Sequence, residues 1–398
     1  MKGITRTVWV LSLVSLFTDT ASEMLYPIMP VYLKSIGFSI VLIGVLEGIA
    51  EATAGFSKGY FGKRSDLSGK RVPFVQMGYA LSALSKPLIP LFIAPLWVFF
   101  ARTMDRLGKG IRTGARDAIL SDEATPETKG KIFGFHRAMD TTGAVLGPLL
   151  ALLYLHFYPA NYKTLFFIAF IPGLLALFTS FLLKDKKSSI KKVQKNTSFF
   201  SFLSYWKTSP PAYRKLAGAL LFFTLFNSSD VFLLLKAKEA GLSDTNVIGV
   251  YIFYNLVYAL FAFPLGVLAD KLGLKKIFIA GLAMFMIAYL GIAFCNTKLL
   301  FYFFFLIYGV YAAATEGVSK AWITNISDKK DTATAVGTYA SLQSICTMMA
   351  SSMAGLIWFH FNPTAAFLIP AIASGFVIVY MLSLKTKPAS ELKPDKKG

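Results

Sequence analysis

Residues 62–71 read GKRSDLSGKR and residues 266–276 read GVLADKLGLKK, with glycine, aspartate and basic positions in the same register 204 residues apart. A second pair of segments, LKSIGFS at residues 33–39 and AKEAGLS at residues 237–243, has the same separation. Two matches at one separation indicate that the chain contains two duplicated halves. A parallel duplication of this kind predicts two similar bundles with a cavity between them.

The composition places both halves in a membrane. The 398 residues are 55% hydrophobic and 16% charged, with a mean hydropathy of +0.57. Apolar runs of about 20 residues, the length that crosses a bilayer as a helix, recur along the chain. We therefore predict an all-α membrane protein with twelve transmembrane helices in two pseudo-symmetric six-helix bundles. The predicted spans are residues 7–33, 40–61, 72–93, 95–115, 131–156, 163–183, 215–236, 246–268, 276–295, 299–321, 332–358 and 364–384.

A polar interval separates the two bundles. We predict that residues 1–184 form the N-terminal six-helix bundle and residues 215–384 the C-terminal one. Residues 185–214 are predicted to be a cytoplasmic linker, since their first part is rich in Lys and Ser. The second part, FFSFLSYWKTSPPAYRK, is typical of an amphipathic segment on the inner membrane surface. Residues 385–398 form a predicted cytoplasmic tail.

The formal charge of +20 raises the question of nucleic-acid binding, which the distribution of the cations answers. If Met1 is inside, all but six of the 41 Lys and Arg residues fall on the inner side of the predicted topology. This asymmetry follows the positive-inside rule. We predict a multi-pass protein of the cytoplasmic (inner) membrane with both termini in the cytoplasm, and no nucleic-acid partner. The six outer cations are Lys34, Lys86, Lys163, Lys236, Lys238 and Lys298.

Enzyme and metal motifs are missing from the sequence. Cys295 and Cys346 both fall in predicted spans and indicate neither a disulfide framework nor a metal site. GKG at residues 108–110 lacks the Ser or Thr after Lys and the preceding strand of a nucleotide-binding loop. We therefore predict no enzyme, no metal and no cofactor, which disfavours a primary pump or a membrane enzyme.

The fourth span ends in the charged run ARTMDRLGKGIRTGARD, residues 101–117. A rise of 1.5 Å per residue from Pro95 places Arg102, Asp105 and Arg106 deep in the hydrocarbon region. Each central charge costs about 2.5–3.5 kcal/mol, so these three side chains cannot face lipid. With Lys109 they are spaced three and four apart, and we predict one stripe that faces the protein interior. Arg112 is expected to continue into the cytoplasmic loop.

Counter-charges occur in other spans of the same half. They are Asp19 and Glu23 in the first span, Glu47 and Glu51 in the second, and His136, Arg137 and Asp140 in the fifth. A buried structural network would explain any one of them, but their number favours a water-accessible transport pathway. A carboxylate that loses a partner or water in one conformation can take up a proton. We predict Asp19, Glu23 and Asp140 as the proton-coupling residues, with Asp19 and Glu23 as the first choice.

The C-terminal half has a different character. Its candidate cavity residues are Asn227, Asp230, Tyr251, Asn255, Glu316 and Lys320, with Tyr254 and Tyr258 near them. Tyr251, Asn255 and Tyr258 share one helix face, where core packing is an equal alternative. Glu316 and Lys320 are spaced either for a pair within one helix or for an inner gate. Charges in one half and aromatic rings in the other suit an amphiphilic or zwitterionic organic molecule.

The two repeated loops resemble the signature loop of the major facilitator superfamily. The matching positions are Gly62, Asp66, Gly69, Lys70 and Arg71 in the first copy and Gly266, Asp270, Lys271, Gly273, Lys275 and Lys276 in the second, while Leu67 replaces a usual cation. The resemblance covers nearly the whole chain and implies a transporter. It also implies that Asp66 and Asp270 act as conformational latches, each near a helix N-terminus. The predicted gating set is Asp66, Arg71, Arg112, Asp270 and Lys271, with the glycines described next.

GAVLGP at residues 143–148 resembles the antiporter motif of exporters in this superfamily. Gly143 and Gly147 allow close helix packing, and Pro148 bends the helix. The runs DRLGKGIRTGARDAIL, FGFHRAMDTTGAVLGP and TEGVSKAW are similar to a prokaryotic permease subgroup within it. The antiporter-like motif implies export of a small molecule by proton antiport, whereas the permease similarity supports the fold and the importance of Arg102 to Arg116. A proton-coupled importer of a small metabolite or siderophore-like molecule and a uniporter without proton coupling stay open. The expected partners are the substrate, protons and the lipid bilayer, and the expected state is a monomer driven by the proton gradient.

Overall fold

The computed structural model describes residues 3–185, 198–295 and 297–384, and these residues form helices and no strands. Most of the predicted linker and the predicted tail, residues 186–197 and 385–398, lie outside this description. Eight of the described helices are long and apolar enough to cross a membrane. They are Arg6–Leu25, Lys129–Phe157, Tyr162–Ser180, Asn246–Leu272, Leu274–Phe294, Lys298–Asn325, Lys329–His360 and Pro363–Ser383.

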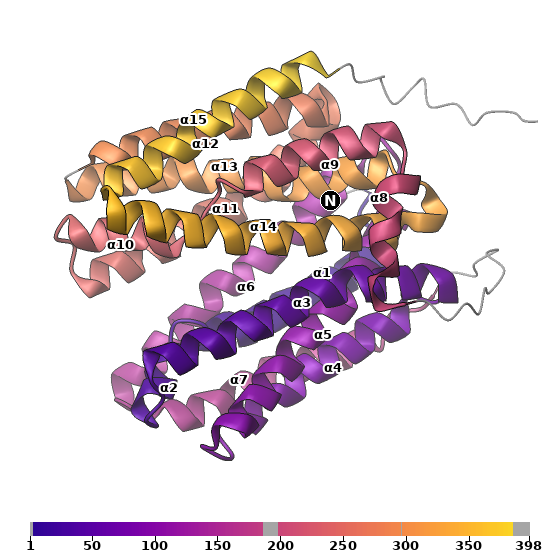
Figure 1. The fold of residues 1–398 in the computed structure, drawn as a ribbon. Coiled ribbons are helices and arrows are strands. Elements are labelled where there is room, and N and C mark those ends of the chain that lie inside the picture. Colours follow the sequence, from indigo (N-terminus) through magenta and orange to yellow (C-terminus); the bar gives the residue numbers. More distant parts are fainter. Residues whose placement is uncertain (1–2, 186–197, 296, 385–398) are drawn as a thin grey trace, which may run out of the picture.

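The helices form two groups, one from each half of the chain, which are coloured indigo to magenta and red to yellow in Figure 1. The first group is α1 (Arg6–Leu25), α2 (Met29–Ser35), α3 (Ile40–Ser68), α4 (Val72–Leu88), α5 (Pro95–Asp122), α6 (Lys129–Phe157) and α7 (Tyr162–Ser180). The second is α9 (Pro211–Thr224), α10 (Val231–Glu239), α11 (Asp244–Leu272), α12 (Leu274–Phe294), α13 (Lys298–Asn325), α14 (Thr332–His360) and α15 (Pro363–Ser383). The predicted all-α fold with two bundles is therefore confirmed.

Two predicted spans are wrong as continuous helices. Span 7–33 is divided between α1 and α2, where Pro27 has no backbone N–H to donate to a helical hydrogen bond. Span 215–236 is divided between α9 and α10. The residues between them include Asn227, Ser228, Ser229 and Asp230, whose short polar side chains compete for backbone hydrogen bonds. Each remaining span corresponds to one helix.

The duplication is visible in how α3 and α11 begin and end. Ser39 and Ser243 each cap the N-terminus of the helix that follows by accepting a hydrogen bond from a backbone N–H three residues later. Gly69 and Gly273 follow the last residues of the two helices with φ of 64° and 102°, a region that favours glycine. The repeated sequence segments therefore begin and end the corresponding helices in the same way in both halves.

The two groups meet where α3 packs on α14 and α6 packs on α11. The contact is closest at the C-terminal end of α3, where a Cβ atom at Gly62 would overlap the Ala333 carbonyl oxygen. At the opposite end of the same helices, Val45 of α3 and Met348 of α14 are 53% and 56% exposed. The halves are therefore closed at one end of the molecule and separated at the other.

The closed end also binds part of the linker. η1 (Phe199–Leu203) and α8 (Ser204–Thr208) run beside both groups in Figure 1. Phe202 is buried against Gly59 of α3, and its carbonyl accepts a hydrogen bond from Thr338 Oγ1 of α14 at 3.3 Å. Phe200 is 54% exposed. This segment is amphipathic, and its buried side packs on the junction of the two halves.

We expect Gly62→Ala to favour a conformation in which the two halves separate at this end of the molecule. The added Cβ meets the backbone of the other half, and overpacking costs about 1–3 kcal/mol. The measurement is the alkylation rate of Ala333→Cys, at a position that is 0% exposed, with Cys295 and Cys346 replaced by Ala. The rate should rise about fivefold or more. Gly44→Ala on the same helix has nothing within 4 Å and should leave the rate unchanged. Equal rates in both variants would contradict the assignment.

Candidate functional site

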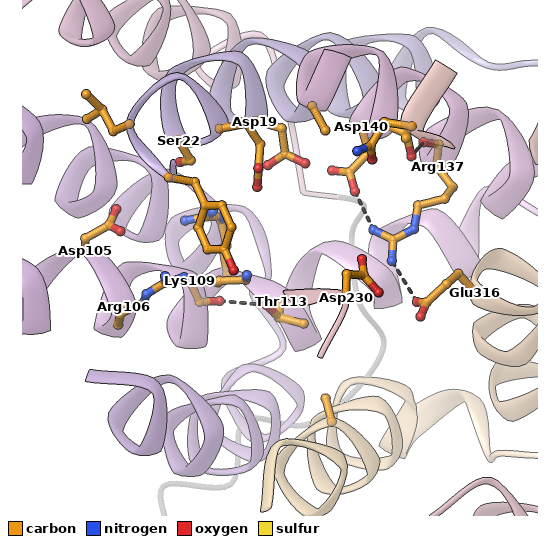
Figure 2. A pocket seen from close by; sticks show the side chains of 18 of the residues that line it. Asp19, Ser22, Asp105, Arg106, Lys109, Thr113, Arg137, Asp140, Asp230 and Glu316 are labelled. Atoms are coloured by element: carbon orange, nitrogen blue, oxygen red, sulfur yellow. Dashed lines mark hydrogen bonds and ion pairs between the residues drawn. The ribbon is translucent and has the colours of Figure 1, made fainter. Parts of the chain in front are cut away.

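A cavity of about 380 Å³ lies between the two halves and is lined by side chains from both. Figure 2 shows charged side chains of α1, α5, α6 and α13 around it, with Asp230 from the segment before α10. The candidate residues that line it are Asp19, Glu23, Arg102, Asp105, Arg106, Arg112, Arg137, Asp140, Asp230, Tyr251, Asn255, Glu316 and Lys320. Glu47, Glu51, His136 and Asn227 are not among the lining residues.

The stripe on α5 faces the protein interior and is paired with α3. Arg102 Nε and Nη2 donate hydrogen bonds to the two carboxylate oxygens of Glu47 at 2.7 and 2.8 Å. Arg106 Nη1 lies 3.0 Å from Glu51 Oε1, one turn further along both helices. The contact between Arg102 and Glu47 is bidentate, and bidentate contacts are among the strong ion pairs that arginine makes. Glu47 and Glu51 therefore hold the α5 arginines in place.

Asp105 has a partner that the sequence did not reveal. Its Oδ1 lies 3.6 Å from Lys86 Nζ on α4, and Lys86 is only 3% exposed. From the predicted topology, Lys86 was expected on the outer side, within the span 72–93. In the structure the N-terminal bundle uses this lysine to neutralise Asp105, which also lies 3.4 Å from Arg102.

Arg137 on α6 joins the two halves. Its Nη1 donates to Asp140 Oδ2 at 2.5 Å, and its Nη2 donates to Glu316 Oε2 of α13 at 2.7 Å (Figure 2). The Ser15 hydroxyl of α1 also donates to Asp140. Asp19 of α1 lines the same cavity, and its carboxyl group and that of Asp140 act on each other. Two neighbouring carboxylates repel each other, and a proton bound by one of them relieves this repulsion.

A second ion cluster crosses between the halves at Asp117, which is 0% exposed. Arg116 Nη2 lies 2.9 Å from Asp117 Oδ1, and Lys320 Nζ of α13 lies 3.0 Å from Asp117 Oδ2. Glu316 and Lys320 therefore do not pair with each other, because each reaches an opposite charge in the N-terminal half. Asp117 was not predicted from the sequence, although its neighbour Arg116 continues the three- and four-residue spacing of the α5 stripe.

Arg112 also differs from its predicted place in a cytoplasmic loop, because α5 extends to Asp122. Arg112 is 6% exposed, donates to Ser82 Oγ at 2.6 Å and stacks 4.6 Å from the Tyr79 ring centroid. Its charge is therefore stabilised by a hydroxyl and an aromatic ring inside the N-terminal bundle.

The C-terminal wall of the cavity is rich in tyrosine and also carries Asp230, Glu316 and Lys320. Tyr251 Oη donates across the cavity to Glu23 Oε2 at 3.3 Å. Asn255 Nδ2 donates to the Tyr251 carbonyl at 3.0 Å, and Tyr308 Oη donates to Asp230 at 2.6 Å. Asp230 is therefore stabilised by a tyrosine hydroxyl group.

Two candidate residues lie away from the main cavity. Asn227 lines a smaller pocket of about 290 Å³ in the C-terminal half, where its Nδ2 donates to Tyr311 Oη at 3.0 Å. His136 is 4% exposed, and both of its ring nitrogens lack a hydrogen-bond partner among the described residues. The structure therefore brings neither of them to the main cavity.

Asp66 and Asp270 make equivalent contacts at the closed end. Asp66 accepts hydrogen bonds from the backbone N–H groups of Ala333 and Thr334, at 3.3 and 2.7 Å, at the start of α14. Asp270 accepts from the N–H groups of Gly130 and Lys131 at the start of α6, both at 2.7 Å. A carboxylate at a helix N-terminus is favourable, and here each carboxylate belongs to the other half.

Among the described residues, an arginine lies beside the first of these two aspartates. Arg71 Nη2 lies 3.3 Å from Asp66 Oδ1, and Arg71 also contacts Asp122. Lys271 lies next to Asp270 in the last turn of α11, but the hydrogen bonds to the Asp270 carboxylate come from Gly130 and Lys131. Asp66 therefore binds a helix end and an arginine, and Asp270 binds a helix end.

The glycines of the predicted antiporter motif lie against α1. A Cβ atom at Gly143 would overlap the Leu16 carbonyl oxygen, and one at Gly147 would lie 2.6 Å from the Thr20 carbonyl oxygen. Pro148 follows inside α6. Close packing here brings α1, with Asp19 and Glu23, against the helix that carries Asp140.

We expect Asp117→Asn to lower the free energy of unfolding in detergent by about 3–5 kcal/mol, because it leaves Arg116 and Lys320 without their counter-charge. Adding Lys320→Met should restore part of this loss, since it removes one of the two stranded cations. Thermal unfolding of the wild type, both single variants and the double variant measures the coupling. Additive effects would show that Asp117 and Lys320 do not interact.

Comparison with known proteins agrees with this architecture. The family model of the Major Facilitator Superfamily matches residues 11–255 and 231–398. An uncharacterized MFS-type transporter of Methanocaldococcus jannaschii is 32% identical over 389 residues, which cover 96% of each chain. Multidrug resistance protein 2 of Bacillus subtilis is 22% identical, covering 95% of this chain and 94% of that protein. The crystal structure of the transporter FucP in the outward conformation has a TM-score of 0.76 at 14% identity, covering 97% and 100%. This chain therefore belongs to the major facilitator superfamily and is a membrane transporter, not an enzyme.

Proposed function

We propose that the chain is a proton antiporter that exports a small amphiphilic or zwitterionic organic molecule by alternating access. The observation that carries this proposal is the pair of carboxyl groups of Asp19 and Asp140 beside Arg137. One proton shared by this pair changes the charge next to a guanidinium that also binds Glu316 of the other half. Proton uptake or release therefore acts on a contact between the halves.

The direction of transport rests on two further observations. Gly143 and Gly147 form the motif that resembles exporters, and they pack α6 on the helix that carries Asp19. The relative from Bacillus subtilis is named for multidrug resistance. The cavity combines charged side chains on the N-terminal wall with tyrosines on the C-terminal wall, which suits a molecule with a charged group and an aromatic body.

The closed end of the molecule carries most of the predicted inner cations, so in this proposal it faces the cytoplasm. The structure then represents the state that is open to the outside, ready to release substrate and take up a proton. We propose that the protein works as a monomer in the cytoplasmic membrane, with both termini inside. Protons are the coupling ion, and no other cofactor is needed.

The test is transport of norfloxacin, an aromatic zwitterion, by purified protein in proteoliposomes with an imposed pH gradient. Wild-type protein should move the compound against its gradient and against the proton flux. Asp19→Asn should lose this driven movement, because an asparagine side chain cannot bind and release the shared proton. Exchange of norfloxacin without a gradient should continue. Movement in the same direction as the protons would instead support the importer.

Glu239→Gln provides a matched control, since Glu239 is a carboxylate outside the cavity that pairs only with Lys236 among the described residues. It should keep the driven transport of the wild type. Full driven transport by Asp19→Asn would remove Asp19 from the coupling mechanism. Movement that never depends on the pH gradient in the wild type would establish the uniporter.

A further inference from the structure

The cations that line the cavity divide into paired and unpaired groups. Six of them have a carboxylate oxygen within 4.0 Å, namely Lys86, Arg102, Arg106, Arg116, Arg137 and Lys320. Within the described part of the chain, Lys58, Lys109 and Arg112 have none. Arg112 is nevertheless stabilised by Ser82 and the Tyr79 ring. Lys58 and Lys109 are therefore the cations in the cavity whose charge is least compensated.

The surroundings of Lys58 do not supply an anion. Its Nζ donates to Ser344 Oγ of α14 at 2.9 Å, which is a neutral partner. Glu51 attracts it, but the Glu51 carboxylate is bound to Arg106 at 3.0 Å. Lys109 lines the same cavity and repels Lys58. An anion that binds both ammonium groups would remove this repulsion between two cations in one cavity.

Lys109 completes the arrangement from α5. Its side chain is exposed and lines the cavity, where Figure 2 shows it beside Arg106. Glu23 attracts Lys109 but lies beyond ion-pair distance and instead accepts a hydrogen bond from Tyr251. The Lys109 ammonium group therefore keeps its hydrogen-bond donors available to a molecule in the cavity.

We propose that Lys58 and Lys109 bind the anionic group of the transported molecule, which is therefore an organic carboxylate or phosphate with an aromatic or apolar body. This inference rests on the proposed transport function and specifies its substrate class. Two ammonium groups on different helices match an oxyanion with several acceptor oxygens. Tyr251, Tyr254 and Tyr258 line the same cavity and provide an aromatic surface for the remainder of the molecule.

The site also lies where binding affects the conformation. The hydrogen bond from Lys58 to Ser344 joins α3 to α14, and Gly55 packs against the same serine. An anion that recruits the Lys58 ammonium group competes with this bond between the halves. Binding of the anionic group therefore acts on the contact that keeps the closed end closed.

The experiment compares four probes that share one ring system, namely 2-naphthoate, 2-naphthyl phosphate, 2-naphthylmethanol and 2-naphthylmethylammonium. Each is titrated into detergent-purified full-length protein while the melting temperature is recorded, since a ligand that binds the folded state raises it. The two anions should raise the melting temperature more than the alcohol, and the ammonium probe least. The anion with the larger shift identifies a carboxylate or a phosphate substrate. An equal or larger shift with the ammonium probe would overturn the proposal.

Lys58→Met and Lys109→Met should each weaken anion binding by about tenfold, the effect of losing one charge-assisted hydrogen bond, and the double variant should lose it. Lys34→Met, an exposed lysine on α2, is the matched control and should bind like the wild type. Without ligand, neither cavity variant should melt at a lower temperature, because each removes an uncompensated charge. A lower melting temperature with unchanged anion affinity would show a structural role and overturn the proposal.

These measurements use no pH gradient, so they are independent of the proton-coupling test. Anion binding that disappears in the lysine variants would stand even if norfloxacin transport proved uncoupled from protons. Conversely, driven transport with no preference for anions would keep the transport proposal and reject this substrate class.

Discussion

The guanidinium of Arg137 binds Asp140 on its own helix and Glu316 in the other half of the molecule, and the arrangement of the cavity depends on this bridge. An arginine between two carboxylates is satisfied only while both are ionised and both halves are near. Asp19 adds a third carboxyl group next to Asp140. In the proposed mechanism, the charge held by this group of acids determines how strongly one half of the transporter binds the other.

The contacts at the closed end are suited to reversible closure. Asp66 and Asp270 each bind a helix N-terminus of the opposite half, an interaction worth about 0.3–1 kcal/mol at a surface and up to about 2 kcal/mol when partly buried. Gly62, Gly130 and Gly266 add close backbone packing without large side chains to disentangle. Modest contacts of this kind allow a small differential binding energy to reverse the equilibrium. The linker residue Phe202 adds to the same junction, so opening this end requires its displacement as well.

Local patterns in the sequence predicted the features that depend on neighbouring residues, namely the helices and their ends. Apolar runs gave the helices, and the repeated loops gave the two bundles, because Ser39, Gly69, Ser243 and Gly273 act within a few residues of their own positions. The break near Pro27 was not predicted, although proline disfavours a continuous helix.

The partners of charged residues were harder to predict because they come from distant segments. Glu316 and Lys320 have ideal spacing for a pair within one helix, yet each binds the N-terminal half instead. Asp117 was missed because the predicted span ended at residue 115, and the role of Lys86 was missed because the predicted topology placed it among the outer cations. No spacing rule connects residue 86 with 105 or residue 117 with 320, so only the three-dimensional packing of α4, α5 and α13 reveals these pairs.

The two walls of the cavity carry incompletely paired charges of opposite sign. On the C-terminal wall Asp230 is stabilised by the Tyr308 hydroxyl, with no cation within 4.0 Å among the described residues. On the N-terminal wall Lys58 has a serine as its hydrogen-bond partner, and Lys109 is exposed to the cavity. Full neutralisation within the protein would have left little electrostatic attraction for a substrate, because each charge would already be paired. A cavity with separated, incompletely neutralised charges attracts a molecule that carries the complementary charge, as proposed for Lys58 and Lys109.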